Sequence, residues 1–126
     1  DPLKRKQLDT GLEQLSHEGV IQLFYRPHLG RTNPVLGAVG ILQFEVLKER
    51  LKNEYNVTAI FQSMSFAAAR WVTGPKEAHD WLQERRDYPV YEDRNGNPVL
   101  LASSAWAIQY AMENAPGLEL HEIEPL

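Results

Sequence analysis

The segment from Val35 to Val57 constrains the fold most, because it predicts a strand, a turn, an amphipathic helix and another strand with almost no residue to spare. One helical face is indicated by apolar side chains at i, i+3, i+7 and i+11, namely Phe44, Leu47, Leu51 and Tyr55. Gly37 and Gly40 precede this helix and are interpreted as glycines that let the backbone turn or approach a neighbour closely. Asn56 tolerates the left-handed conformation that ends a helix, and Val57 is predicted to open the next strand.

The elements on either side of the predicted helix complete an αββαβ order over residues 3–63. A first helix begins at Asp1-Pro2, since Asp is a good N-cap and Pro suits the first helical position, and it ends at Gly19. Residues 20–25 are β-branched and aromatic and predict a strand. Residues 26–34 contain Pro, Gly and Asn and predict a loop. Residues 35–39 and 57–63 supply the second and third strands.

The second half of the chain predicts the same order again. Residues 66–72 indicate a strand, residues 76–86 a helix, and the Asn95-Gly96 pair a hairpin between strands at 90–93 and 98–102. Ser103 or Ser104 is predicted to cap a helix whose inward face carries Trp106, Tyr110, Ala107 and Ala111. Residues 118–124 form the last strand, which makes the order from residue 66 onward βαββαβ, the split arrangement of ferredoxin-like folds.

The predicted fold class is therefore α+β. We expect a ferredoxin-like two-layer sandwich in which the αββαβ order occurs twice, over about 3–63 and 66–124. The chain has 126 residues, which suits one ordinary domain. Within it we expect two similar halves, residues 1–64 and 65–126.

The composition narrows the class of protein. The absence of cysteine excludes disulfides and thiolate metal sites and fits a reducing cytoplasm. A formal net charge of −4 argues against sequence-independent binding of naked nucleic acid, which relies on neutralising phosphates. No apolar run approaches the roughly 18 residues of a membrane span, so no membrane association is expected. Because Asp1 already opens a helix, we expect the chain to be part of a longer protein.

No motif for nucleotide binding or catalysis is present in the sequence. Residues 37–40 lack both the third glycine of a dinucleotide fingerprint and the Lys-Ser/Thr ending of a phosphate-binding loop. The four histidines show no metal-ligand spacing, and there is no Gly-x-Ser-x-Gly nucleophile elbow. We therefore expect no cofactor, no metal and no catalytic residue in this chain.

Three arginines are the candidates for partner or inter-domain contact. Arg70 lies in an otherwise apolar predicted strand, where burying a lone charge is costly. It must reach solvent, pair with an internal carboxylate or contact a partner, and the sequence leaves these alternatives open. Arg26 and Arg31 lie on the predicted loop, and such arginines suit phosphate or interface contacts better than a solvated helix face does.

Several segments together resemble one family of translation factors. The first is the stretch from Lys6 to Tyr25, the second is Val35–Val57, and the third is the Ala69-Arg70-Trp71-Val72 run. Within the second segment the resemblance rests on Gly37, Ala38, Val39, Gly40, Leu42, Gln43, Phe44, Leu51 and Glu54-Tyr55-Asn56-Val57. On these residues the chain resembles the C-terminal domain of bacterial peptide chain release factor 3, a translational GTPase related to elongation factor G. The resemblance is strong over residues 3–73 and weaker from residue 74 onward.

The resemblance implies a role for the chain within a larger protein. Members of the family use GTP to promote the release of class I release factors from the ribosome in translation termination. GTP or GDP and magnesium bind in an N-terminal domain that these 126 residues do not contain. This chain would dock on the ribosome, at small-subunit protein and ribosomal RNA, and would couple to the N-terminal domains of its own full-length chain. The resemblance further implies a cytoplasmic, monomeric fragment in which Gly37, Gly40, Gln43 and Phe44 form a structural motif.

Two alternatives of other classes remain open at the level of sequence. The first is a free-standing ferredoxin-like module that binds a small ligand or RNA on its sheet. Aromatic side chains exposed together on the open face of the sheet would favour it. The second is an enzyme with a dispersed acid–base pair, which the missing motifs disfavour.

Overall fold

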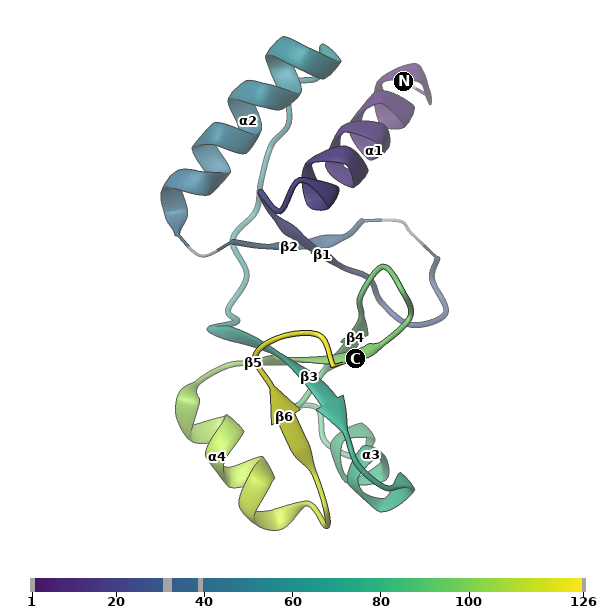
Figure 1. The fold of residues 1–126 in the computed structure, drawn as a ribbon, viewed down its shortest axis with the longest axis vertical. Helices are drawn as coiled ribbons and strands as arrows, with labels where there is room; N and C mark the ends of the chain where they lie inside the picture. Colours follow the sequence, from purple (N-terminus) through teal and green to yellow (C-terminus); the bar gives the residue numbers. More distant parts are fainter. Residues whose placement is uncertain (1, 31–32, 39, 126) are drawn as a thin grey trace. The chain divides into compact units, whose positions relative to one another are not determined.

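A computed structural model describes residues 2–30, 33–38 and 40–125 of the chain, and Figure 1 shows its elements. The chain divides into two compact units, each of which is described by itself. The first unit comprises Asp1–Leu23 and Val35–Ser63, and the second comprises Phe24–Pro34 and Met64–Leu126. Helices and strands occur in both halves of the chain, and the sheets are antiparallel where their pairing is described. The predicted α+β class and ferredoxin-like sandwich are confirmed.

The first unit is built on two helices, α1 (Pro2–His17) and α2 (Ile41–Tyr55), which lie side by side in Figure 1. Their facing sides carry the buried leucines of the two helices, namely Leu12, Leu15, Leu47 and Leu51. The predicted apolar face of α2 is therefore confirmed at its two leucines. Strands β1 (Gln22–Phe24) and β2 (Val35–Gly37) pair in a two-stranded sheet.

Gly11 lets the two helices approach closely. A Cβ atom built on Gly11 would lie 2.7 Å from Leu51 Cδ2 and 3.0 Å from Tyr55 Cγ, closer than real Cβ contacts allow. Leu51 is completely buried, so its side chain has no free space to move into. Helix α1 therefore carries a glycine at a close contact with α2, although glycine is a poor helix former.

The C-terminal end of α2 confirms one expectation and corrects another. Asn56 is the C-cap in the left-handed conformation, with φ of 56°, as predicted. Its amide and that of Val57 both donate to the Leu51 carbonyl, the latter at 3.0 Å. The strand predicted over 57–63 is wrong, because no strand is assigned to these described residues. The amide of Val57 completes the helix cap and is no longer available to start a ladder. The first αββαβ order therefore lacks its last strand.

The second unit contains a four-stranded sheet in the order β4-β5-β3-β6. Its strands are β3 (Ala68–Thr73), β4 (Val90–Glu92), β5 (Pro98–Ala102) and β6 (Glu119–His121). Strand β3 pairs antiparallel with both β5 and β6, and β4 pairs antiparallel with β5. This pairing matches the split βαββαβ order expected from residue 66 onward.

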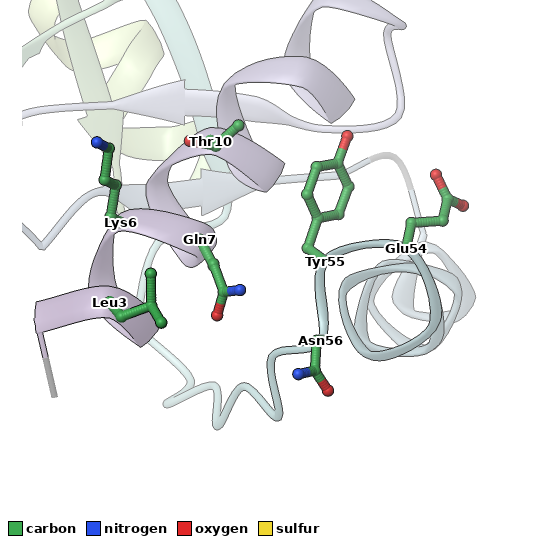
Figure 2. A pocket seen from close by; sticks show the side chains of 7 residues that line it. All are labelled: Leu3, Lys6, Gln7, Thr10, Glu54, Tyr55 and Asn56. Atoms are coloured by element: carbon green, nitrogen blue, oxygen red, sulfur yellow. The ribbon is translucent and has the colours of Figure 1, made fainter.

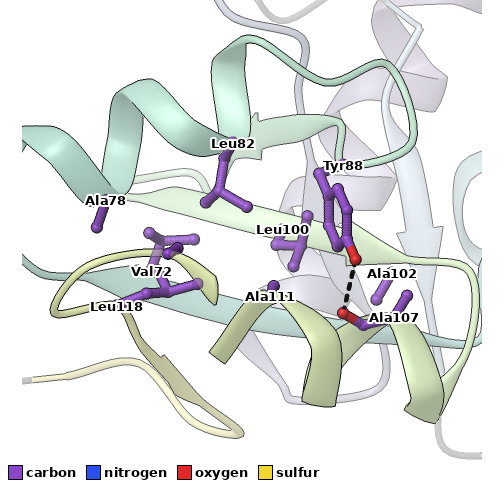
Figure 3. Close-up of a cluster of buried hydrophobic side chains, with 10 residues drawn as sticks. Val72, Ala78, Leu82, Tyr88, Leu100, Ala102, Ala107, Ala111 and Leu118 are labelled. Carbon is purple, nitrogen blue, oxygen red and sulfur yellow. Dashed lines mark hydrogen bonds between the residues drawn. The ribbon is translucent and has the colours of Figure 1, made fainter. Parts of the chain in front are cut away.

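Two helices cover one face of this sheet, as Figure 3 shows. Ala78 and Leu82 of α3 (Lys76–Gln83) and Ala107 and Ala111 of α4 (Ala105–Asn114) pack with buried residues of the strands. The Tyr88 hydroxyl donates to the Ala107 carbonyl at 3.0 Å, and burial raises the pKa of this phenol. This hydrogen bond ties α4 to the segment between α3 and β4, and the small alanines of α4 pack closely in the core.

The inward face predicted for α4 is half wrong. Ala107 and Ala111 are buried, but Trp106 is 70% exposed and Tyr110 is 41% exposed. The two alanines pack in the core of this unit, and the larger rings, one residue earlier in each case, lie on an adjacent flank of the helix. Of the two predicted caps, Ser104 is the one that forms, since its hydroxyl accepts from the Ala107 amide at 3.0 Å.

Candidate functional site

Arg70 lies on β3 and is held by contacts within its own unit. Its Nη2 lies 3.4 Å from Glu122 Oε1, and its Nη1 donates to the Ala69 carbonyl at 3.0 Å. The register that pairs Trp71 with His121 brings Glu122 opposite Arg70. Of the alternatives that the sequence left open, the structure therefore contains the internal ion pair. Glu122 is 81% exposed at its side chain, so this pair is solvated and contributes at most about 1 kcal/mol.

The structure describes one of the other two candidate arginines. Arg26 is exposed at the start of the loop after β1, and its side chain makes no ion pair or hydrogen bond within the described part of the chain. Arg31 lies outside the described residues. The structure thus assembles no arginine cluster from the residues that it describes.

The predicted structural motif lies around the start of α2. Gly37 is part of β2, and Gly40 is the N-cap of α2. The Gly40 backbone is extended, with φ of −146°, and a Cβ there would meet nothing within 4 Å. Gly40 therefore makes no close approach to a neighbour, but it lies at a bend, and its carbonyl accepts from the Gln43 amide at 3.1 Å. Gln43 and Phe44 are half-buried, and the Phe44 ring lies 6.1 Å from that of Phe61.

An ion-pair network crosses the two helices of the first unit. The guanidinium of Arg50 on α2 binds Glu54 one turn away and Glu18 just beyond the end of α1, at 2.7 and 2.9 Å. Hydrogen bonds from Arg50 lower the pKa of both carboxyls, and the two carboxylates raise that of the guanidinium. Lys4 Nζ donates to the Asn56 carbonyl at 2.6 Å, where a cation is favoured by the dipole of α2. These contacts fix the two helices antiparallel.

An open depression of about 440 Å³ lies between α1 and the end of α2 (Figure 2). Lys6, Gln7 and Thr10 line it from α1, and Tyr55 and Asn56 line it from α2. The Gln7 Oε1 atom is buried and has no hydrogen-bond partner among the residues described. Glu54, also in the lining, already pairs with Arg50. The depression therefore offers one unused acceptor and no acid–base pair.

A hydroxyl–imidazole pair on the sheet has the residue types of a catalytic triad, but its hydrogen bonds are not those of a triad. Thr73 Oγ1 lies 2.7 Å from His121 Nε2. In a nucleophile–base–orienter triad the acidic residue binds the imidazole, but Glu119 accepts from Thr73 instead, at 3.4 Å. The geometry is that of a cross-strand polar cluster between β3 and β6.

Asp93 organises the β4–β5 hairpin from a largely buried position. Its Oδ1 accepts from the amides of Asn95 and Asn97 at 2.8 and 2.9 Å, and its Oδ2 accepts from Trp71 Nε1 at 2.9 Å. Burial alone would raise the pKa of Asp93, but these hydrogen bonds outweigh it and hold the pKa below its ordinary value. The carboxylate therefore stays ionised and links the turn to β3.

The opposite face of this sheet carries aromatic side chains that are buried. Trp71 and Tyr91 are 6% and 7% exposed, and Trp71 meets Phe24 edge-on at 6.1 Å between ring centres. Aromatics gathered on an open sheet face were the condition for the alternative of a free-standing RNA-binding module. These two side chains do not meet that condition.

Four rings on the helical layer instead form a continuous series, which we call the aromatic row: Trp106, Tyr110, Trp81 and Tyr88. Their centres are 5.1, 6.2 and 5.1 Å apart in that order. The Arg85 guanidinium carbon lies 3.8 Å from the centre of the Trp81 ring. The sequence pattern did not reveal this row, because it suggested an inward position for Trp106 and Tyr110. The sequence did contain a signal for it: α4 has one apolar face with Ala107 and Ala111 and another with Trp106 and Tyr110, and a surface helix buries only one such face.

Comparison with known proteins decides the family. The family model described as class II release factor RF3, C-terminal domain, matches residues 1–112. The chain belongs to this family. The expected resemblance is thereby confirmed, and the match continues beyond residue 73 as far as residue 112.

Individual relatives of the RF3 family agree with this assignment. The chain is 42% identical over 122 residues to peptide chain release factor 3 of Symbiobacterium thermophilum, and 46% identical over 122 residues to that of Aromatoleum aromaticum. It is 45% identical over 125 residues to that of Nitrosomonas europaea. These matches cover 94–98% of the chain but only 22–23% of each relative. The chain therefore spans less than a quarter of the length of these curated relatives.

Two further properties of the part of the chain that the structure describes bear on its function. No group of three or more His, Cys, Asp or Glu side chains among them is arranged to hold a metal ion. Within the same residues, no helix combines the length and the apolar character required to cross a membrane.

Proposed function

We propose that this chain is the C-terminal ribosome-docking and inter-domain coupling domain of a longer translational GTPase. The full-length protein would use GTP to promote the release of class I release factors from the ribosome in translation termination, and this domain would contribute to that activity. The observation that carries this proposal is the RF3 C-terminal family match over residues 1–112. Relatives named peptide chain release factor 3 support it, since the match extends over nearly the whole chain.

The proposal places the nucleotide chemistry outside these 126 residues. GTP or GDP and magnesium would bind in the N-terminal part of the longer protein, and the chain would contribute no catalytic residue. The sequence supports this division, because residues 37–40 lack the lysine with which a phosphate-binding loop reaches its nucleotide.

The work assigned to the chain is mechanical. The first unit contains two helices in close contact at Gly11, and the second contains an antiparallel sheet with two helices packed on it. Units packed this tightly move as rigid bodies when a hinge elsewhere opens or closes. Residues 1–126 would form one domain, made of two similar halves at 1–64 and 65–126, and the isolated chain would be a monomer. The parent protein would act in the cytoplasm.

Arg26, Arg31 and Arg70 are the proposed contact residues of this domain. Arg26 is exposed and makes no ion pair within the described residues, which suits an RNA phosphate or an acidic protein group. Arg70 is paired with the exposed Glu122, so a partner would have to share or replace this carboxylate. For that reason Arg26 is the stronger candidate of the two for docking on the small subunit.

The test uses the full-length protein and the same protein truncated before residue 1 of this chain. The readout is the GTP-dependent dissociation of a fluorescently labelled class I release factor from ribosomes after peptide release. We expect the truncated protein to bind GTP and to lose most of this activity. Recycling at the full rate by the truncated protein would refute the proposal, as would measurable GTP hydrolysis by the 126-residue chain alone.

A further inference from the structure

The two units share an order of elements but differ by one strand. In the first unit α1, β1, β2 and α2 follow one another, and in the second α3, β4, β5 and α4 do so (Figure 1). The second unit has an additional strand, β3, directly before its first helix. In its sheet, β3 lies between β5 and β6. A strand in the corresponding position of the first unit would precede α1.

Strand β2 is the counterpart of β5 and has one open edge. Strand β5 pairs on both sides, with β4 and with β3. Strand β2 pairs with β1 alone among the described residues. Burial differs in the same way, because residues 99–102 of β5 are buried, whereas residues 35–37 of β2 are all half-buried. An open row of amide and carbonyl groups is a template on which another strand can pair.

The segment after α2 points to the same position. Along residues 57–62 buried or half-buried side chains alternate with exposed ones, and Ile60 is 93% exposed. This period of two is that of a β-strand, but the segment pairs with no strand in the part of the chain that the structure describes. Its counterpart in the second unit, β6, pairs with β3. Because the Val57 amide is used in the helix cap, a ladder on this segment would begin at Thr58.

We propose that the residues immediately preceding residue 1 in the parent protein form a strand that docks antiparallel on the open edge of β2. Its other edge would lie against residues 58–62, which completes a four-stranded ferredoxin-like sheet in the first unit. The relatives have chain to supply this strand, because the match to a C-terminal domain covers only 22–23% of their length. Strand β3 has six residues and ends two residues before α3, and a strand of that length would fit before α1 in the same way.

This strand would be the element that couples the domain to the rest of the protein. A flexible linker before residue 1 would let the domain move independently of the part that precedes it. A strand held by a ladder on β2 moves with the first unit as one rigid body. The inference deepens the proposed function and rests on its placement of the chain within a longer protein. Release-factor recycling tests that function, whereas hydrogen exchange at β2 tests the strand.

The experiment measures amide hydrogen exchange by mass spectrometry in four proteins. They are the full-length parent, the 126-residue chain, the chain extended by about ten upstream residues, and the extended chain with those residues replaced by glycine and serine. We expect residues 35–37 and 58–62 to exchange at least about tenfold more slowly in the parent and in the extended chain than in the other two. Residues 47–51 and 99–102 should be protected in all four and show that both units are folded.

Three results would overturn the proposal. The first is equal exchange at residues 35–37 in the 126-residue chain and in the extended chain, and the second is protection that survives the glycine–serine replacement. The third is protection at residues 58–62 without protection at 35–37, which would place the upstream residues away from β2. If only the full-length parent is protected, another domain covers β2 and the proposal is wrong. Full recycling by the truncated parent would refute the proposed function without changing these exchange rates.

Discussion

At Gly11 a hydrogen atom occupies the place where a methyl group would lie 2.7 Å from Leu51 Cδ2. Alanine is the better helix former by about 1 kcal/mol, so an exposed position would gain from Gly→Ala. Here the clash with buried Leu51 and with the Tyr55 ring should cost more, since overpacking costs about 1–3 kcal/mol. We expect Gly11→Ala to lower the free energy of unfolding, measured by urea denaturation.

Thr10→Ala is the matched control for this substitution. Thr10 is the exposed neighbour of Gly11 on the same helix, and alanine there should be neutral or slightly stabilising. If both variants were equally stable, the close contact between the helices would carry no energetic weight.

A second effect at this scale concerns the carboxylate of Asp93. Its pKa is lowered in the folded chain, so its stabilising contribution is complete above the unfolded value, about 3.9, and is lost as the pH falls through the folded value. The free energy of unfolding should therefore decrease as the pH drops below about 4. Urea titrations between neutral and acidic pH, followed by tryptophan fluorescence, measure this slope.

Asp93→Asn removes the titrating group and should flatten that part of the slope. At neutral pH it should also cost about 1–3 kcal/mol, because the new amide group would face the donors of Trp71 and Asn97. The exposed Asp87→Asn is the control and should leave the acid slope unchanged. An unaltered slope in Asp93→Asn would show that other carboxyls cause the acid sensitivity.

At the scale of whole elements, α4 depends on its N-cap. Ser104 accepts from the Ala107 amide, so Ser104→Ala should destabilise the chain by about 1 kcal/mol. Ser104→Asp should retain the cap, and Ser103→Ala, one residue earlier and exposed, should have little effect. Thermal melts followed by circular dichroism compare the three variants. Equal melting temperatures for both alanine variants would contradict the assigned cap.

Elements with their own start and stop signals were predictable from the sequence. Asn95-Gly96 predicted the hairpin between β4 and β5, and Asn56 predicted the end of α2. The leucines of α2 predicted which side of that helix is buried. The absence of a strand over 57–63 could not be predicted from the sequence. Nothing in the composition of this segment reveals that the Val57 amide completes a helix cap. In α4 the larger rings suggested the wrong inward face, since the sequence does not show that only small alanines fit beneath the helix.

The candidate site was less predictable than the fold, for a similar reason. The arginines were chosen by residue type and segment, and Glu122 opposite Arg70 became apparent only from the register of β3 and β6. The aromatic row joins side chains of α3 and α4, which are far apart in the sequence, with Tyr88 of the segment after α3. Neither arrangement has a local spacing that a motif could capture.

At the scale of the molecule, the chain carries a net charge of −4, and its large exposed apolar residues are scattered over several elements. Mutual repulsion and the lack of one extensive apolar patch disfavour self-association. We expect sedimentation equilibrium to give the monomer mass of 14.4 kDa at all concentrations tested. A mass that rises toward twice this value with concentration would contradict the prediction.

The carboxylate at the β4–β5 turn has a consequence for protein engineering. Exposed hairpin turns are usual places to insert a tag or a reporter peptide. In this turn Asp93 binds the amides two and four residues ahead and the indole of β3 at the same time, which fixes both the length and the sequence offset of the turn. An insertion at Asn95-Gly96 would separate these donors from their shared acceptor. This turn is therefore a poor permissive site despite its accessibility, and labels for tracking the domain belong elsewhere.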